Sequence, residues 1–176
     1  GAAGMAITRL LISCGLSNVI MCDKYGTLYK GNPEMNPEQA LLAEITNPDN
    51  IKGTLSDAIC GADVFIGVSA PNLVTPEMVK SMAKDCILFP MANPTPEIMP
   101  DLALEAGARV VGTGRSDFNN QINNLLAFPG IFRGALDCRA SCINEEMKMA
   151  ASFALANMID QKDLNENNII VSPLNK

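Results

Sequence analysis

The sequence predicts an α/β fold with a doubly wound, mostly parallel sheet, and three observations carry this prediction. Apolar, strand-like runs alternate with helix-like segments through the middle of the chain, which is the pattern of successive βαβ units. One of these runs, residues 63–68, is continuously apolar after its first residue, as in strands covered on both faces of a parallel sheet. The third observation is a helix at the N-terminus that opens with glycine and alanine.

The N-terminal helix is predicted from its apolar periodicity. Four residues share one helix face at the spacing i, i+3, i+4 and i+7, namely Ile7, Leu10, Leu11 and Cys14. The tetrapeptide Gly1, Ala2, Ala3, Gly4 precedes this face, and Gly15 can end the helix. Residues 18–22 then predict a strand that ends at Asp23.

These features match the second and third parts of a dinucleotide-binding fingerprint. In that fingerprint, glycines open a helix and an acidic residue follows about 20 positions later. The unpaired N–H groups of a helix N-terminus favour a pyrophosphate, and Asp23 can accept hydrogen bonds from the hydroxyls of an adenine ribose. The first glycine of the fingerprint and the strand before it are missing. We therefore expect a Rossmann-like sheet truncated at its N-terminus. A glycine-rich turn in another α/β protein is the alternative.

The elements after Asp23 follow from turn residues and helix caps. Residues 26–37 form a loop marked by glycine and proline, and Thr54 with Asp57 has the pattern of a capping box that starts a helix ending at Gly61. Small residues follow the strand at 63–68, where open α/β sheets bind ligands. The other predicted elements are helices at 38–45, 75–83 and 97–106, strands at 86–89 and 109–112, a long helix after Asn144, and a strand or extended segment at 168–171.

The stretch 112–124 is rich in asparagine. Asn119 and Asn120 are most simply solvated loop residues. Asn123 and Asn124 open the apolar segment 125–132, which we expect to be buried, and a buried amide needs a partner that either a ligand or a helix end would supply. The long helix after Asn144 is expected to be core, with a buried face formed by Met147, Ala151, Ala154, Leu155 and Met158.

The composition of the chain argues against several classes of function. A net charge of −6 without a Lys/Arg cluster argues against nucleic-acid partners, and no apolar run reaches the roughly 18 residues of a membrane helix. The six cysteines lack C-x-x-C spacing, which favours buried free thiols in a reducing cytoplasm. The sequence has no histidine, so we expect neither a zinc site nor histidine-based acid–base catalysis in this chain.

Five motifs carry a resemblance to a known family. They are GAAG at 1–4, CDKYG at 22–26, GADVFIGVSAPNLVT at 61–75, ANPTPEI at 92–98 and VVGTGRSDFNNQINNLLAFPGIFRGALD at 110–137. With these motifs, residues 1–176 resemble the NAD(P)-binding Rossmann-type domain of malic enzymes over essentially the whole length.

The resemblance implies an oxidoreductase that uses NAD or NADP to oxidise L-malate and decarboxylate it to pyruvate and CO₂, with Mg²⁺ or Mn²⁺ in the full enzyme. It also implies a homo-oligomer, in the cytoplasm or an organelle. In the family the catalytic lysine and tyrosine and the metal-binding carboxylates precede the glycine motif. We therefore expect this chain to be a fragment without the N-terminal catalytic domain, inactive by itself, and assign it no catalytic residue and no metal ligand.

The resemblance also implies site residues. Gly1, Ala2, Ala3 and Gly4 would hold the pyrophosphate and Asp23 the adenine ribose. Asp23 repels a 2′-phosphate and so favours NAD, whereas Lys24 beside it would soften that preference. Val68, Ser69 and Ala70 would lie near the nicotinamide half. The remaining cofactor and substrate contacts are amides, with Asn93 and Asn123 toward the cofactor and Asn93 and Asn124 toward the malate carboxylate.

Two other functions remain open from the sequence. One is a non-catalytic nucleotide-binding or interaction module that kept the fold, and the other is a Rossmann dehydrogenase of another small acid. The ANPTPEI motif at 92–98 argues against the second. We also expect the missing first strand to lower the stability and to leave bare sheet edges.

Overall fold

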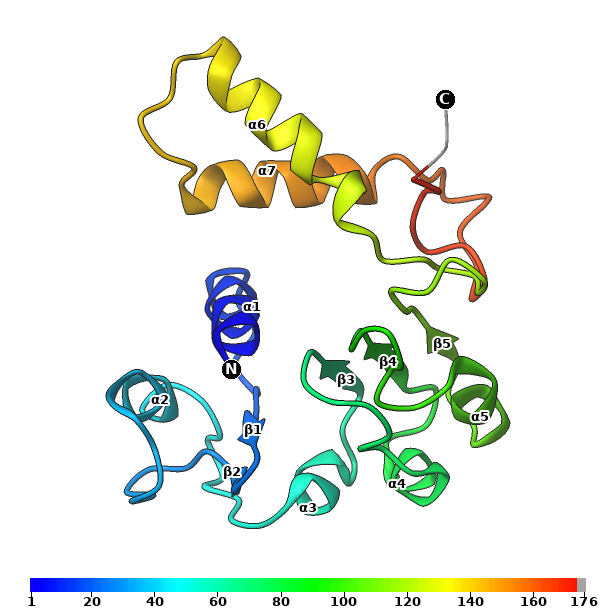
Figure 1. Cartoon of the computed structure of the whole chain (residues 1–176). Helices are drawn as coiled ribbons and strands as arrows, with labels where there is room; N and C mark the ends of the chain where they lie inside the picture. Colours follow the sequence, from blue (N-terminus) through cyan, green and yellow to red (C-terminus); the bar gives the residue numbers. More distant parts are fainter. Residues whose placement is uncertain (174–176) are drawn as a thin grey trace.

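The structure is a computed structural model, and it describes residues 1–173 (Figure 1). A parallel three-stranded sheet has the order β3 (Val64–Gly67), β4 (Ile87–Pro90), β5 (Val110–Val111). A separate antiparallel pair joins β1 (Cys22–Asp23) to β2 (Gly26–Thr27). The helices are α1 (Ala2–Ser13), α2 (Pro37–Ala43), α3 (Leu55–Ile59), α4 (Pro76–Ser81), α5 (Pro100–Glu105), α6 (Phe128–Asp137) and α7 (Glu145–Ala156), with a 3₁₀ helix η1 (Asn124–Leu126).

The α/β class and the parallel sheet are confirmed. The connection from β3 to β4 runs through α4, and the one from β4 to β5 runs through α5, so each pair of neighbouring strands is a βαβ unit. Helix α4 begins one residue after the start predicted at Thr75, because the Thr75 hydroxyl accepts a hydrogen bond from Met78 N at 3.3 Å as the N-cap and Pro76 occupies the first helical position.

The main hydrophobic core lies between this sheet and its helices. Leu88 of β4, which is fully buried, packs there with Ile59 of α3, Val79 of α4 and Ala103 of α5. A smaller core of Met21, Leu28 and Leu42 lies under α2 and the β1–β2 pair. The chain therefore buries its apolar side chains in two clusters, and the strand-like segment of residues 18–22 belongs to the smaller one.

The predicted strand at 18–22 is wrong in extent, because only Cys22 and Asp23 pair, and they do so antiparallel with β2. The chain reverses directly after Asp23, whose carboxylate accepts a hydrogen bond from Tyr25 N at 2.8 Å, and Gly26 has the positive φ (+109°) that this turn needs. The acidic residue thus sits at a hairpin, not at the end of a long strand.

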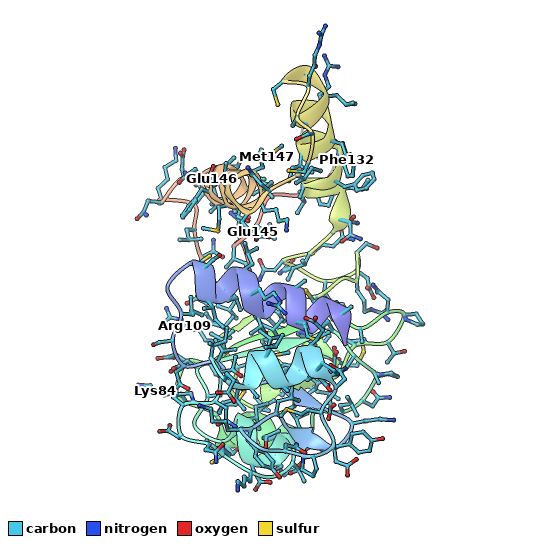
Figure 2. The ribbon with its side chains drawn as sticks, turned by 90° about the vertical axis from the view of Figure 1, so that its left-hand side faces the viewer. Lys84, Arg109, Phe132, Glu145, Glu146 and Met147 are labelled. Atoms are coloured by element: carbon cyan, nitrogen blue, oxygen red, sulfur yellow. The ribbon has the colours of Figure 1, made fainter. Side chains whose placement is uncertain are left out.

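The sequence analysis expected segment 125–132 and one face of the long helix after Asn144 to be buried, and helices α6 and α7 show that this expectation is wrong. Asn144 does cap α7, accepting a hydrogen bond from Met147 N at 2.9 Å. Yet α6 and α7, both fully described, contain no buried residue, and the apolar segment 125–132 is largely exposed. Figures 1 and 2 show the reason, because these two helices lie against each other and away from the parallel sheet, with Phe132 pointing outward.

Three smaller expectations also change. The helix expected at 97–106 begins only at Pro100. The strand expected to be covered on both faces leaves Val64 exposed, because β3 lies at the edge of the described sheet. Of the strand or extended segment expected at 168–171, no strand forms, although Val171 is buried. The capping box of Thr54 and Asp57 is confirmed, with Asp57 Oδ2 accepting from Thr54 N at 2.7 Å.

The cysteines are all free, as expected, but only Cys86 is buried and Cys22 is half-buried. Within the described part of the chain, no helix is both long and apolar enough to cross a membrane.

Candidate functional site

The candidate site lies at the carboxyl edge of the parallel sheet. Gly67 of β3 and Pro90 of β4 are register partners at the ends of their strands. The segments 68–70 and 91–93 therefore leave the sheet side by side, at the edge where open α/β sheets bind ligands. Val68 is half-buried, whereas Ser69 and Ala70 are exposed.

Glu97 ties these two segments together. One carboxylate oxygen, Oε1, accepts a hydrogen bond from Ser69 N at 2.9 Å, and the other, Oε2, accepts one from Ala92 N at 3.0 Å. The side chain is 0% exposed, so both bonds lie out of water. Gly67 makes room for it, because a Cβ there would lie 2.6 Å from Oε1. Glu97 thus fixes the loops that follow β3 and β4.

Sequence reasoning missed Glu97. It placed the residue at the start of a helix, whereas the structure puts it in the loop before α5. The available signal was a carboxylate set between Pro96 and Ile98, in a segment too apolar to leave it solvated.

Asn93 follows directly and is exposed at the same edge. Its amide lies against Gly114, where a Cβ would stand 3.3 Å from both Nδ2 and Oδ1. The loop after β5 therefore reaches the loop after β4, and Asn93 presents its amide where the three loops meet.

The glycine motif reaches this edge from α1. Gly1 is the N-cap of α1, no side chain caps the helix, and its first turn contains no acidic residue. Gly4 lies beside Val68, with 3.7 Å between a Cβ placed at Gly4 and Val68 Cγ2. That is an ordinary contact distance, so the helix start packs beside Val68 with room for a Cβ at position 4. The structure does bring the helix start together with the end of β3.

Asp23 has two hydrogen-bond donors. Tyr25 N donates to Oδ1 and Gln39 Nε2 donates to Oδ2, each at 2.8 Å. Lys24 next to it is exposed and places its ammonium 4.6 Å from the centre of the Tyr25 ring. The interaction with the Tyr25 side chain is the main cause that raises the pKa of Lys24. The partner Gln39 was not predicted from the sequence.

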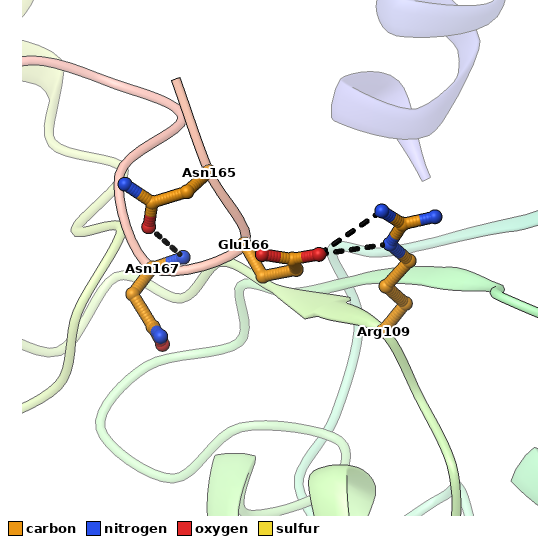
Figure 3. Close-up of polar contacts among 4 residues, drawn as sticks. All are labelled: Arg109, Asn165, Glu166 and Asn167. Atoms are coloured by element: carbon orange, nitrogen blue, oxygen red, sulfur yellow. Dashed lines mark hydrogen bonds and ion pairs between the residues drawn. The ribbon is translucent and has the colours of Figure 1, made fainter. Parts of the chain in front are cut away.

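The asparagine stretch divides differently from the prediction. Asn120, expected in solvent, is buried, donating to Val111 O at 3.1 Å and Glu166 O at 2.8 Å and accepting from Ile169 N at 3.0 Å. It therefore joins β5 to the C-terminal segment. Figure 3 shows a second link there, in which the Arg109 guanidinium donates to Glu166 Oε1 at 3.0 Å. A backbone hydrogen bond at Glu166 itself, and next this interaction with Arg109, lower the pKa of Glu166.

Asn123 takes the helix-capping alternative in this structure. Its side-chain oxygen accepts a hydrogen bond from Leu125 N at 2.9 Å and so caps η1, while Asn124 is exposed. The role of these two amides toward a cofactor or substrate therefore stays a prediction. Among residues 1–173, no three His, Cys, Asp or Glu side chains gather as a metal site.

Cys22 gives a direct test of the β1 environment. Burial, with the negative charge of Asp23 as a second cause, raises the pKa of Cys22 to about 11 from the ordinary 9.0. This lowers its thiolate fraction about 100-fold. We expect iodoacetamide at pH 8 to modify Cys22 about 100-fold more slowly than exposed Cys60, measured by peptide mass spectrometry. In urea the two rates should converge, and equal rates in the folded chain would contradict this environment.

Comparison with known proteins identifies close relatives. The family model described as "Malic enzyme, NAD binding domain" matches residues 5–176. The NAD-dependent malic enzyme of Geobacillus stearothermophilus is 57% identical over 175 residues, which are 99% of this chain and 36% of the relative. The bifunctional malic/malolactic enzyme of Bacillus subtilis (strain 168) is 56% identical over 177 residues, 100% of this chain and 43% of the relative.

Solved structures of malic enzymes are also similar to this chain. The crystal structure of an NAD-dependent malic enzyme from Thermotoga maritima aligns with a TM-score of 0.92 and 43% identity, covering 97% of this chain and 45% of that one. The chain therefore spans less than half the length of these relatives. Malic enzymes described as NADP-dependent are also similar, at 48% identity over 161 and 162 residues.

Proposed function

Because the chain belongs to the malic enzyme family and matches the NAD-binding domain of these enzymes, we propose that it binds NAD in preference to NADP. The residues proposed to bind the cofactor are Asp23 and those at the carboxyl edge of the parallel sheet. The observation that carries the preference is the Asp23 carboxylate, half-buried at the β1–β2 turn and hydrogen-bonded by neutral groups. A carboxylate accepts from a ribose diol and repels a 2′-phosphate.

The described residues fit a dinucleotide. The start of α1, Gly1 to Gly4, has no side-chain cap and no acidic residue, so its N–H groups are available to a pyrophosphate. Lys24 would lie beside the adenosine end, exposed and with its ammonium over the Tyr25 ring. Val68, Ser69 and Ala70 would flank the nicotinamide half, in loops that Glu97 holds in place. The nicotinamide is the group that would accept hydride.

The amides would orient ribose and substrate. Asn93 is exposed at the meeting point of three loops, and we propose that it binds the nicotinamide ribose and the malate carboxylate. Asn123 would contribute to the cofactor side and Asn124 to the substrate side. For Asn123 the amide NH₂ group would be the donor, while its oxygen already accepts one hydrogen bond in the η1 cap.

We further propose that the complete protein oxidises and decarboxylates L-malate to pyruvate and CO₂. Its Mg²⁺ or Mn²⁺ and its proton-transferring groups would lie in segments other than residues 1–173, among which we assign no metal ligand. A homo-oligomer and a cytoplasmic location fit the same proposal.

Calorimetric titration of this chain with NAD and with NADP tests the proposal. We expect NAD to bind more tightly than NADP, and malate with Mn²⁺ to leave both affinities unchanged, since no metal ligand is assigned here. Absence of binding by either nucleotide would contradict a cofactor-binding role for this chain, and tighter binding of NADP would contradict the preference.

Substitution Asp23→Ser should shift the preference toward NADP. The variant removes the charge that repels a 2′-phosphate, and it leaves one hydroxyl in place of two carboxylate oxygens. We expect NAD to bind about tenfold more weakly and NADP to bind at least as tightly as before, measured by the same titrations. Asp49→Ser, at an exposed loop residue, is the matched control. An unchanged ratio would show that Asp23 does not select the cofactor.

A further inference from the structure

We propose that Gln39 is a specificity-determining positioning residue, which acts on the cofactor through Asp23 by holding its carboxylate in the orientation that receives a ribose diol. The inference rests on the proposed function and names a second residue that controls the choice between NAD and NADP. Gln39 lies in the first turn of α2, 16 residues after Asp23 in the sequence.

The environment of Gln39 determines which way its amide points. The side chain is 9% exposed, and its Oε1 accepts a hydrogen bond from Asn36 N at 2.9 Å while its Nε2 donates to Asp23 Oδ2 at 2.8 Å. A flipped amide would set its NH₂ group against the Asn36 N–H and its oxygen against a carboxylate. Both contacts would be repulsive, so the observed orientation is the only one of the two that satisfies every group.

Asp23 is thereby held at both oxygens. Tyr25 N binds Oδ1 and Gln39 Nε2 binds Oδ2, so the plane of the carboxylate is fixed before any ligand arrives. Each oxygen retains a further lone pair, which suits the two adjacent hydroxyls of a ribose. A carboxylate fixed in advance binds a diol without losing rotamer freedom at that moment.

The two hydrogen bonds to Asp23 also preserve its preference for NAD over NADP. The two groups bound to Asp23 are a backbone N–H and a neutral amide, so they orient its negative charge without neutralising it. The nearby ammonium of Lys24 lies over the Tyr25 ring. A 2′-phosphate would therefore meet the negative charge of Asp23 at the position Gln39 imposes, softened by the attraction between Asp23 and the Lys24 ammonium.

The capping box of α2 supplies a matched control. Asn36 Oδ1 accepts from Gln39 N at 2.9 Å, so Asn36→Ala removes a helix cap but leaves the Gln39 side-chain bonds intact. Gln39→Met removes both side-chain bonds with little change in volume. Gln39→Glu keeps the oxygen that accepts from Asn36 N and so preserves the cap, but it sets a second carboxylate against Asp23.

The test is titration of this chain and its variants with NAD and NADP, with thermal unfolding followed in parallel. We expect Gln39→Met to weaken NAD about tenfold and NADP less than about twofold, so the preference falls at least about fivefold. Asn36→Ala should lower the unfolding temperature and keep the preference of the original chain. Gln39→Glu, which retains its cap, should still weaken NAD about tenfold if Gln39→Met fails to fold.

The outcomes separate the two proposals. Failure of the original chain to bind NAD would contradict the proposed function itself. NAD binding by the original chain, with an equal loss of NAD and NADP affinity in Gln39→Met, would show a structural role only and overturn this inference. Unchanged NAD affinity in Gln39→Glu would overturn it as well.

Discussion

Replacing Glu97 by Gln should destabilise the folded chain by about 2–4 kcal/mol. The carboxylate accepts from Ser69 N and Ala92 N through its two different oxygens, and it is fully buried. Glutamine has one oxygen, so its NH₂ group would face one of these two N–H donors. That donor would lose its partner without access to water, and a buried, unpaired N–H group costs about 1–3 kcal/mol beyond the lost charge-assisted bond.

Urea unfolding of the variant measures this effect. Glu105→Gln is the control, because Glu105 lies exposed on α5 and its change should stay within about 0.5 kcal/mol. Since Ser69 and Ala92 begin the loops assigned to the nicotinamide half, Glu97→Gln should also weaken NAD binding. Equal unfolding midpoints for the two variants would show that Glu97 does not hold the loops.

Replacing Gly26 by Ala should destabilise the chain by about 3 kcal/mol or more. Gly26 has φ +109°, a region in which a Cβ costs about 1–2 kcal/mol. The added Cβ would also collide with the backbone oxygen of Gly53, which is bound to Thr27 N at 2.9 Å. Because the obstacle is backbone, no side-chain rotation relieves it, and the β2 strand must move away from residues 51–54.

Gly31 provides the matched control for this experiment. It also has a positive φ, +83°, but a Cβ there meets nothing within 4 Å, so Gly31→Ala should cost only about 1–2 kcal/mol. Thermal and urea unfolding compare the two variants. Asp23 is the register partner of Gly26, so Gly26→Ala should weaken NAD as well. Equal effects of the two substitutions would mean that contact with Gly53 contributes nothing.

The features of the candidate site that the sequence indicated are those in which one local segment has a recognisable pattern. Asp23 was identified because an acidic residue follows a glycine-containing helix start at the right spacing, and the loops after β3 and β4 because small or polar residues follow apolar runs. The residues that hold these features in place, Glu97 and Gln39, were not predicted from the sequence. Glu97 lies 28 positions from Ser69, and Gln39 lies 16 from Asp23, so no local pattern joins either pair.

Burial was the property that sequence patterns predicted least well. Asn120 is a polar residue in a polar stretch, and it is buried only because the C-terminal segment returns to it with Glu166 and Ile169. The opposite holds for α6 and α7, which are apolar in part but contain no buried residue because they lie away from the parallel sheet and its core. Apolar periodicity shows that a face can be buried, but the partner that buries it is set elsewhere.

The sequence by itself determined the α/β class, the family, the order of the central strands and helices, and the caps at Thr54 and Asn144. These depend on residues within a few positions of one another, where backbone preference and short hydrogen bonds decide the outcome. Only the tertiary structure decided that Glu97 joins two loops, that Gln39 orients Asp23, and that Asn120 is buried. Each of these depends on a hydrogen bond between distant segments, and such a bond has a definite partner only after the chain has folded.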